Sequence, residues 1–128
     1  QIIFESDFTP IELARFIARL PSKLFGINYD IGNSAALGLN PMEEFAAYGV
    51  RVVNVHVKDR ELGGTTVPLK TGNADFDTVF AALAQLDYQG NFILQTARAA
   101  DGNHVEVLRG YLGMTQHLMQ QYGLAVAQ

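Results

Sequence analysis

Four strand-like, apolar stretches of the chain end in side chains that can bind a metal ion: Glu5, Asp30, His56 and Gln95. Because side chains alternate between the two faces of a strand, these four donors all fall on one face and leave the other face apolar. Two carboxylates, one imidazole and one amide oxygen suit Mn²⁺, Mg²⁺, Co²⁺, Fe²⁺ or Zn²⁺. The pattern therefore predicts a divalent-metal site with positions open for two substrate oxygens, able to stabilise an enediolate-like charge.

Further polar side chains accompany these four donors. Asn28 and Asn54 lie two residues before the second and third donors, so they should share the same face one layer below. Buried amides need hydrogen-bond partners, which favours a pocket with a polar floor over a dry core. Lys58, Arg60 and Arg98 lie just beyond strand ends, where they would hold a phosphate or carboxylate group. The alternative is that these cations form ordinary salt bridges with neighbouring carboxylates.

The hydrophobic pattern supplies the elements that would position these residues. We expect strands at residues 1–6, 25–30, 51–57 and 91–96, and helices at residues 9–20, 42–49, 76–86 and 103–122. Thr9, Asn40 and Asp75 are the expected N-caps of the first three helices, and Glu12 would complete a capping box with Thr9. No helix or strand is assigned to residues 31–39.

The alternation of strands and helices predicts an α/β fold of four parallel βα units, forming a single domain over residues 1–128. Parallel α/β sheets place their chemistry at the C-terminal ends of the strands, where the four donors lie. Along the third strand, Val53, Val55 and Val57 should face the covering helices. The Gly/Thr/Pro-rich segment 58–74 exceeds the usual strand-to-helix link, which indicates a functional loop.

Composition narrows the class of protein. The 128 residues are 48% hydrophobic and 17% charged, as in a globular domain, and the net charge of −4 argues against nucleic-acid binding driven by bulk charge. Cysteine is absent, so neither disulfides nor Cys-based metal sites are expected. No apolar run approaches the roughly 20 residues that span a membrane, and no signal peptide is visible, so we expect a cytoplasmic protein. The start at Gln1 suggests a piece of a longer chain.

Several motifs together resemble a known family. They are "FES", "YDIGNSAALG", "VHVKDR" and "TGNADFDTVFAALAQLDYQGNFILQTAR", in this order. The chain resembles the C-terminal half of a sugar-phosphate isomerase/epimerase of the xylose-isomerase-like TIM-barrel superfamily. That superfamily also includes endonuclease IV, inosose dehydratases and ketose 3-epimerases. The resemblance implies that the four strands correspond to strands five to eight of a (β/α)₈ barrel.

The resemblance also implies a ligand set. Epimerases of this group take metal ligands from the ends of strands five to eight in the order Glu, Asp, His, Glu. The first three match Glu5, Asp30 and His56, whereas Gln95 departs from the pattern. Asn33 occupies the place where ketose epimerases often carry a substrate-binding histidine, which puts specificity for free ketoses in doubt.

The departure at Gln95 has a chemical consequence, because an amide can ligate through oxygen but cannot act as a base. We therefore expect a metal-dependent sugar or sugar-phosphate isomerase/epimerase that uses one base. The expected catalytic residues are Glu5 and Lys58, and the expected substrate-binding residues are Asn28, Asn33, Asn54, Arg60 and Arg98. Alternatives are a dehydratase of the inosose or dehydroshikimate type and an inactive fragment of the same fold. An endonuclease-IV-like nuclease is disfavoured by the acidic charge and the single ligand histidine.

The expected partners follow from the half-barrel. Four parallel strands alone would leave two unpaired edges and an open inner face. We expect a homo-oligomer in which a second copy closes the barrel, or association with a missing N-terminal half-barrel. The ligand would be a small sugar or sugar phosphate, with neither nucleic acid nor membrane as a partner.

Overall fold

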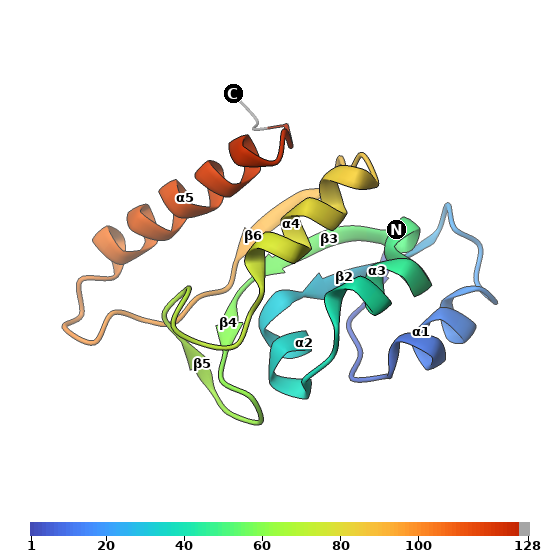
Figure 1. Cartoon of the computed structure of the whole chain (residues 1–128), viewed down its shortest axis with the longest axis horizontal. Coiled ribbons are helices and arrows are strands. Elements are labelled where there is room, and N and C mark those ends of the chain that lie inside the picture. Colours follow the sequence, from blue (N-terminus) through green and yellow to red (C-terminus); the bar gives the residue numbers. More distant parts are fainter. Residues whose placement is uncertain (126–128) are drawn as a thin grey trace.

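The computed structural model describes residues 1–125 and shows a parallel sheet flanked by helices (Figure 1). The strands lie in the order β1 (Ile2–Phe4), β2 (Phe25–Asp30), β3 (Val52–Val57) and β6 (Asn91–Leu94). All neighbouring strands in this sheet are parallel. The predicted α/β fold of four parallel βα units is therefore confirmed.

The main helices are α1 (Pro10–Ile17), α3 (Pro41–Tyr48), α4 (Phe76–Gln85) and α5 (His104–Gln121). The capping signals placed the starts of the first three correctly. The Glu12 carboxylate accepts the Thr9 backbone N–H at 3.0 Å and its hydroxyl at 2.6 Å. Asn40 and Asp75 each accept a backbone N–H from the first turn of their own helix, at 3.0 Å in both cases. Successive helices pack side by side, α1 against α3, α3 against α4 and α4 against α5.

Helix α2 (Ile31–Leu37) was not expected from the sequence. It begins directly where β2 ends, because the Asp30 carboxylate accepts the Asn33 backbone N–H at 2.8 Å and caps the helix. It ends at Gly38, whose φ of 69° lies in the left-handed region that favours glycine. A helix of two turns carries too little periodicity to be detected, and its start is hidden in the preceding strand.

The segment expected to be a long loop contains a short antiparallel hairpin, β4 (Asp59–Arg60) with β5 (Thr66–Val67). A 3₁₀ turn, Gly49–Arg51, also precedes β3. The buried Asp59 carboxylate accepts the backbone N–H groups of Gly72 and Ala74, at 2.9 and 3.0 Å. These bonds fold the second half of the segment back onto the hairpin.

The prediction for Val53 is wrong. The register between β2 and β3 shifts in the middle of the pair, which makes Val53 the extra residue of a β-bulge. Val52 joins Val55 and Val57 in the core, whereas Val53 packs on the backbone of Gly26. A Cβ at position 26 would lie 2.4 Å from a Val53 methyl carbon, so this contact requires glycine.

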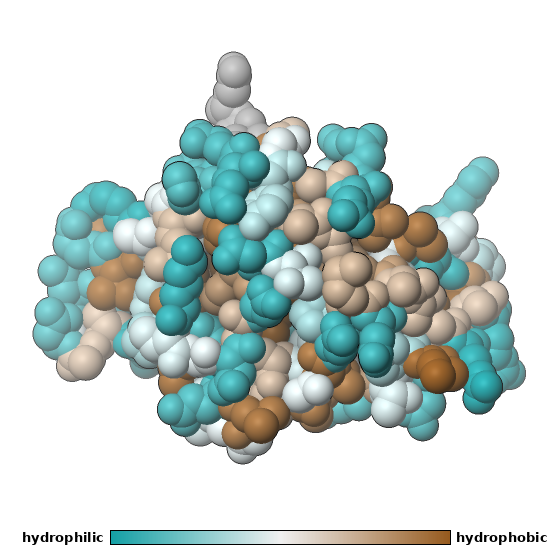
Figure 2. All heavy atoms as spheres, in the orientation of Figure 1, coloured by the Kyte–Doolittle hydropathy of each residue, from teal (hydrophilic) through white to brown (hydrophobic). Residues whose placement is uncertain are grey.

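The hydrophobic core lies between the sheet and the helices, and its largest fully buried residues include Ile17, Ile27, Ile31, Val55, Val57, Val79, Phe80, Leu83 and Leu118. On the opposite face of the sheet Ile3 and Ile93 are each 46% exposed, so that face is only partly covered. Hydrophilic and hydrophobic residues are interspersed on the side of the molecule drawn in Figure 2. None of the described helices is long and apolar enough to cross a membrane.

Candidate metal centre

Glu5, Asp30 and His56 meet at the C-terminal ends of three adjacent strands. One ligand atom from each lies within 4.8 Å of the others. The parallel register pairs Asp30 with His56, and the His56 Nδ1 atom lies 3.5 Å from Asp30 Oδ2 and 3.4 Å from Glu5 Oε2. Two carboxylates and an imidazole therefore face one small volume, which is the donor set of a divalent-cation site.

Asp30 has one satisfied and one unsatisfied oxygen. Its Oδ1 atom caps α2, as described above, which holds the carboxylate in place. Its Oδ2 atom is buried and has no hydrogen-bond partner within the described part of the chain. The His56 Nδ1 and Lys58 Nζ atoms each lie 3.5 Å from this oxygen. A buried carboxylate oxygen without a donor is costly, and a bound cation is one way to satisfy it.

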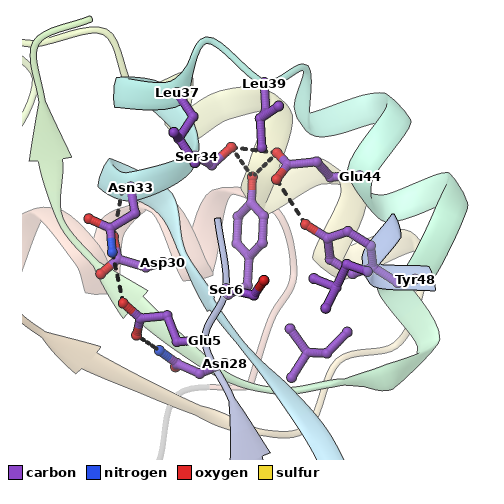
Figure 3. A pocket seen from close by; sticks show the side chains of 13 residues that line it. Glu5, Ser6, Asn28, Asp30, Asn33, Ser34, Leu37, Leu39, Glu44 and Tyr48 are labelled. Atoms are coloured by element: carbon purple, nitrogen blue, oxygen red, sulfur yellow. Dashed lines mark hydrogen bonds between the residues drawn. The ribbon is translucent and has the colours of Figure 1, made fainter. Parts of the chain in front are cut away.

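Both oxygens of Glu5 accept hydrogen bonds from asparagine side chains (Figure 3). Asn28 donates to Oε2 and Asn33 donates to Oε1, the latter at 2.7 Å. Asn28 in turn accepts from Asn54 at 2.6 Å through its own oxygen. The buried amides of Asn28 and Asn54 therefore form a hydrogen-bonded pair beneath the Glu5 carboxylate. This pair supplies the hydrogen-bond partners that buried amides need at the floor of a polar pocket.

The Asn28 contact also defines the state of His56. The Asn28 amide nitrogen lies 3.1 Å from His56 Nδ1, and it must be the donor because the amide oxygen already accepts from Asn54. In this contact Nδ1 is the acceptor and carries a lone pair. That is the form in which an imidazole nitrogen ligates a metal.

Lys58 and Gln95 lie at the edge of this cluster. The Lys58 ammonium donates to the Gln95 amide oxygen at 3.1 Å and lies 3.5 Å from the orphaned oxygen of Asp30. Lys58 therefore lies between Gln95 and the Asp30 carboxylate, and the amide oxygen of Gln95 already accepts a hydrogen bond from it. The structure places Gln95 beside Lys58, and among the described contacts its amide oxygen bonds that lysine and no member of the Glu5, Asp30 and His56 cluster.

The two arginines expected to bind substrate have different surroundings. The Arg60 guanidinium donates to the Gly64 carbonyl from Nε and Nη2, at 3.1 and 2.7 Å, and to Asn33 Oδ1 from Nη1, at 2.9 Å. Arg98 is exposed and lines a separate hollow with His104 and Leu108. Among the described contacts none joins Arg98 to the cluster, so the structure brings Arg60 to the site and leaves Arg98 outside it.

A second polar group, centred on the buried Glu44, was missed from the sequence. A narrow hollow lined by Glu5, Asn33, Ser34 and Glu44, among others, joins it to the candidate metal centre (Figure 3). The Glu44 carboxylate accepts hydrogen bonds from Tyr29 and Tyr48, both at 2.8 Å, and from Ser34. These contacts tie α3 to β2 and α2, so Glu44 holds the elements that carry Asp30 and Asn33.

Burial and the nearby Glu44 charge raise the pKa values of Tyr29 and Tyr48 well above the ordinary tyrosine value. Both hydroxyls therefore remain protonated and donate to Glu44. A signal for this group exists in the sequence, because Glu44 lies four residues before Tyr48 on the face of α3 that also carries Phe45. A glutamate on the apolar face of a helix indicates a buried partner.

The comparisons with known proteins agree with this architecture. The family model for the xylose isomerase-like TIM barrel matches residues 3–112. The chain belongs to the xylose isomerase-like TIM barrel family. A crystal structure of a xylose isomerase domain protein from Planctomyces limnophilus superposes with a TM-score of 0.78 at 22% identity, covering 93% of this chain and 46% of that one. Because the chain matches less than half of that structure, its fold is part of a TIM barrel.

Two further proteins are similar to this chain and also extend well beyond the part that it matches. A D-tagatose 3-epimerase-like protein of known structure superposes with a TM-score of 0.60 at 22% identity, over 90% of this chain and 47% of that one. A protein of Methanocaldococcus jannaschii described as uncharacterised is 28% identical over 109 residues, which make up 81% of this chain and 37% of that protein. The chain thus spans about half the length of these solved structures and less of the curated relative.

Proposed function

We propose that the chain carries the metal centre of a divalent-metal-dependent sugar or sugar-phosphate isomerase/epimerase. The observation that carries the proposal is the orphaned, buried Asp30 Oδ2 facing the same volume as the Glu5 carboxylate and His56 Nδ1. Family membership supports it, because the relatives include a xylose isomerase domain protein and a D-tagatose 3-epimerase-like protein. The proposed substrate is a small sugar or sugar phosphate.

The residues present fit a divalent ion. Glu5, Asp30 and His56 would hold it, and Gln95 would become a fourth ligand if its amide oxygen were released by Lys58. The proposed metals are Mn²⁺, Mg²⁺, Co²⁺ and Zn²⁺, all of which accept mixed oxygen and nitrogen ligands. When bound, such an ion acts as a Lewis acid toward the substrate's carbonyl and neighbouring hydroxyl oxygens.

The chain's own residues would move the proton and hold the substrate. Glu5 would take the proton from the carbon beside the carbonyl and return it to the former carbonyl carbon, through an enediolate-type intermediate. A second proton would pass from the neighbouring hydroxyl oxygen to the former carbonyl oxygen, which balances the isomerisation. Lys58 would offer its positive charge to the developing oxyanion or to a phosphate group. Asn28, Asn33 and Asn54 would contact substrate oxygens, and Arg60 would bind an anionic end. Arg98, in a separate hollow, would contact only a part of the substrate remote from the metal.

A dehydratase of the inosose or dehydroshikimate type is the second candidate. The observation in its favour is that the fourth expected ligand is Gln95, an amide whose oxygen accepts a hydrogen bond from Lys58. A β-elimination needs a single base, whereas a two-base epimerisation needs a second carboxylate. An inactive chain that keeps only the fold is the remaining alternative.

We also propose the domain organisation, the partner and the cellular location of the chain. We take residues 1–128 as a single (β/α)₄ half-barrel domain, of which 126–128 lie outside the described residues. Its proposed partner is a second copy of the chain or an N-terminal half-barrel that would complete eight strands. The proposed location is the cytoplasm, which cell fractionation tests.

Metal titration tests the proposed centre. Calorimetric titration with Mn²⁺ should show a single saturable site in the unmodified protein and its loss in Asp30→Asn. The amide of that variant keeps an oxygen for the N–H of Asn33 but turns an NH₂ group toward the site. Asp101→Asn, which changes an exposed acid beyond β6, serves as the control. Unsaturable binding, or equal binding in Asp30→Asn, would contradict the metal centre.

Reaction in deuterated water separates the two candidate activities. A panel of free and phosphorylated ketoses and aldoses, followed by NMR, should show deuterium entering the carbon beside the carbonyl if isomerisation occurs. Elimination would instead release water and form an unsaturated product. Binding of Mn²⁺ without either reaction would support the inactive alternative.

A further inference from the structure

The side chain of Asn33 lies between Arg60 and Glu5, and its orientation is fully determined by these two neighbours. Arginine has only donors, so the Asn33 oxygen must face Arg60. The carboxylate of Glu5 accepts, so the Asn33 NH₂ group must face Glu5. The two bonds, 2.9 and 2.7 Å long, therefore form a directed chain from Arg60 to Oε1 of Glu5.

Arg60 is itself held by the β4–β5 hairpin. Its Nε and Nη2 atoms both donate to the carbonyl of Gly64, in the turn of that hairpin. The turn is closed by backbone bonds from Gly64 N–H to the Glu61 carbonyl at 2.9 Å and from Glu61 N–H to the Thr65 carbonyl at 3.3 Å. Because the guanidinium is planar, the bonds to Gly64 direct Nη1 toward Asn33.

Glu5 needs such support because it lies just beyond the end of β1, with its side chain 40% exposed. A half-exposed glutamate would otherwise populate several rotamers. Asn28 holds Oε2 and Asn33 holds Oε1, and the oxygen of each asparagine is itself occupied, by Asn54 and by Arg60. Each carboxylate oxygen therefore faces an amide that cannot rotate without breaking a second bond.

We propose that Asn33 and Arg60 are positioning residues for Glu5, and that Arg60 acts on the metal centre through Asn33. The inference rests on the proposed role of Glu5 as a metal ligand, and it gives the long segment 58–74 a purpose. The β4–β5 hairpin restricts the side chain of Glu5, which the sheet alone would leave free to change rotamer.

Mn²⁺ affinity in single and double variants tests the chain of contacts. Asn33→Leu and Arg60→Met should each weaken Mn²⁺ binding by about tenfold, the lower end of what lost outer partners of metal ligands cost. The double variant should be no weaker than Asn33→Leu, because Arg60 acts only through Asn33. Unchanged affinity in Arg60→Met, or losses that multiply in the double variant, would overturn the proposal.

Arg51→Met is the matched control for lost stability. The Arg51 guanidinium also donates to backbone carbonyls, those of Ile17, Leu20 and Phe25, but it lies remote from Glu5. The variant should lower the unfolding midpoint as Arg60→Met does, while leaving the Mn²⁺ dissociation constant unchanged. If Arg51→Met weakens Mn²⁺ binding equally, the effect of Arg60 is a general loss of stability and the positioning role is wrong.

A metal-free measurement separates this inference from the proposed function. In ¹H–¹⁵N spectra recorded with a chelator, the side-chain NH₂ signals of Asn33 should shift in both Arg60→Met and Glu5→Ala. If the unmodified protein binds no Mn²⁺ but these shifts occur, the metal proposal fails and the positioning of Glu5 stands. If Asn33 signals are insensitive to Arg60, the positioning fails whatever the metal result.

Discussion

Glu5 and Gln95 follow the first and last strands of the sheet, and they differ in the one property that proton transfer requires. Both side chains offer an oxygen, but only the carboxylate can accept a proton from a carbon acid. The Gln95 amide oxygen also accepts a hydrogen bond from the Lys58 ammonium, so a positive charge lies beside it. We therefore propose chemistry with a single base at Glu5.

Exchanging the carboxylate at position 5 and the amide at position 95 tests the single-base assignment. Glu5→Gln should lower kcat by about 10²-fold or more, since it removes the base while keeping an oxygen ligand. Gln95→Glu should retain much of the activity, because the new carboxylate can pair with Lys58. Steady-state kinetics with saturating Mn²⁺ provide the measurement. Full activity in Glu5→Gln would rule out the single-base assignment.

Three buried tyrosines predict a loss of stability at alkaline pH. Burial raises the pKa values of Tyr29, Tyr48 and Tyr88 above the ordinary value of 10.0. Below about pH 10 these tyrosines are protonated in both states, and their stabilising effect is fully present. Above that pH the unfolded chain ionises first, so the free energy of unfolding should fall by about 1.4 kcal/mol per pH unit for each tyrosine.

Urea unfolding between pH 8 and pH 12 measures this slope. Tyr88→Phe should make the decline above pH 10 shallower, because one ionising group is removed. Tyr88 is the suitable position, since among the described residues its hydroxyl bonds the Asn91 carbonyl and not Glu44. A slope that is the same above and below pH 10 would contradict the burial of these hydroxyls.

At the scale of elements, α2 is the piece on which the site depends most. It begins at Asp30, carries Asn33 on one side and presents Ser34 to Glu44 on the other. Glu44 also binds hydroxyls from β2 and from its own helix, so one carboxylate fixes α2 relative to its neighbours. Helix α3, though outside the site, therefore contributes to its geometry.

The adjacent residues Glu43 and Glu44 on α3 allow a matched test of the contacts that Glu44 makes. Glu44→Ala should lower the free energy of unfolding by about 3 kcal/mol or more, because several buried hydroxyls lose their acceptor. Glu43→Ala, at an exposed position in the same turn, should change it by less than about 0.5 kcal/mol. Urea denaturation with equal m-values measures the free energy of unfolding. Comparable decreases in both variants would show that the hydrogen bonds of Glu44 do not hold α3 to its neighbours.

At the scale of the whole molecule, the sheet has two open edges, at β1 and β6. On the face of the sheet opposite the core, which would be the inner face of a barrel, Ile3 of β1 and Ile93 of β6 are each 46% exposed. Parallel sheets are normally covered on both faces, and matched structures are about twice as long as this chain. These features support closure by a second half, either another copy or an N-terminal half-barrel.

Mass in solution tests closure by a second copy. The isolated 14.0 kDa chain should elute with at least twice that mass in light-scattering chromatography. Ile93→Lys should shift it to the monomer, since it places a charge on the inner face. Val50→Lys, at a site that is 81% exposed before β3, should leave the mass unchanged. A clean monomer for the unmodified chain would exclude self-pairing.

The sequence by itself determined the sheet, the main helices and the meeting of Glu5, Asp30 and His56. These follow from local patterns, because strand periodicity assigns a side chain to a face and parallel strands bring their C-terminal ends to one edge. It did not reveal α2, whose cap is the same Asp30, or the bulge that turns Val53 out of the core. Both depend on how β2 pairs with β3 and continues beyond it.

Only the tertiary structure decided which partners the polar side chains take. Arg60 reaches Asn33 across 27 residues of sequence, and Lys58 reaches Gln95 across 37. Before the fold is known, a cation beyond a strand end is equally a substrate contact, a salt bridge or a brace. The choice depends on which side chains the fold brings within hydrogen-bond distance, and that distance is set by packing between elements far apart in the chain.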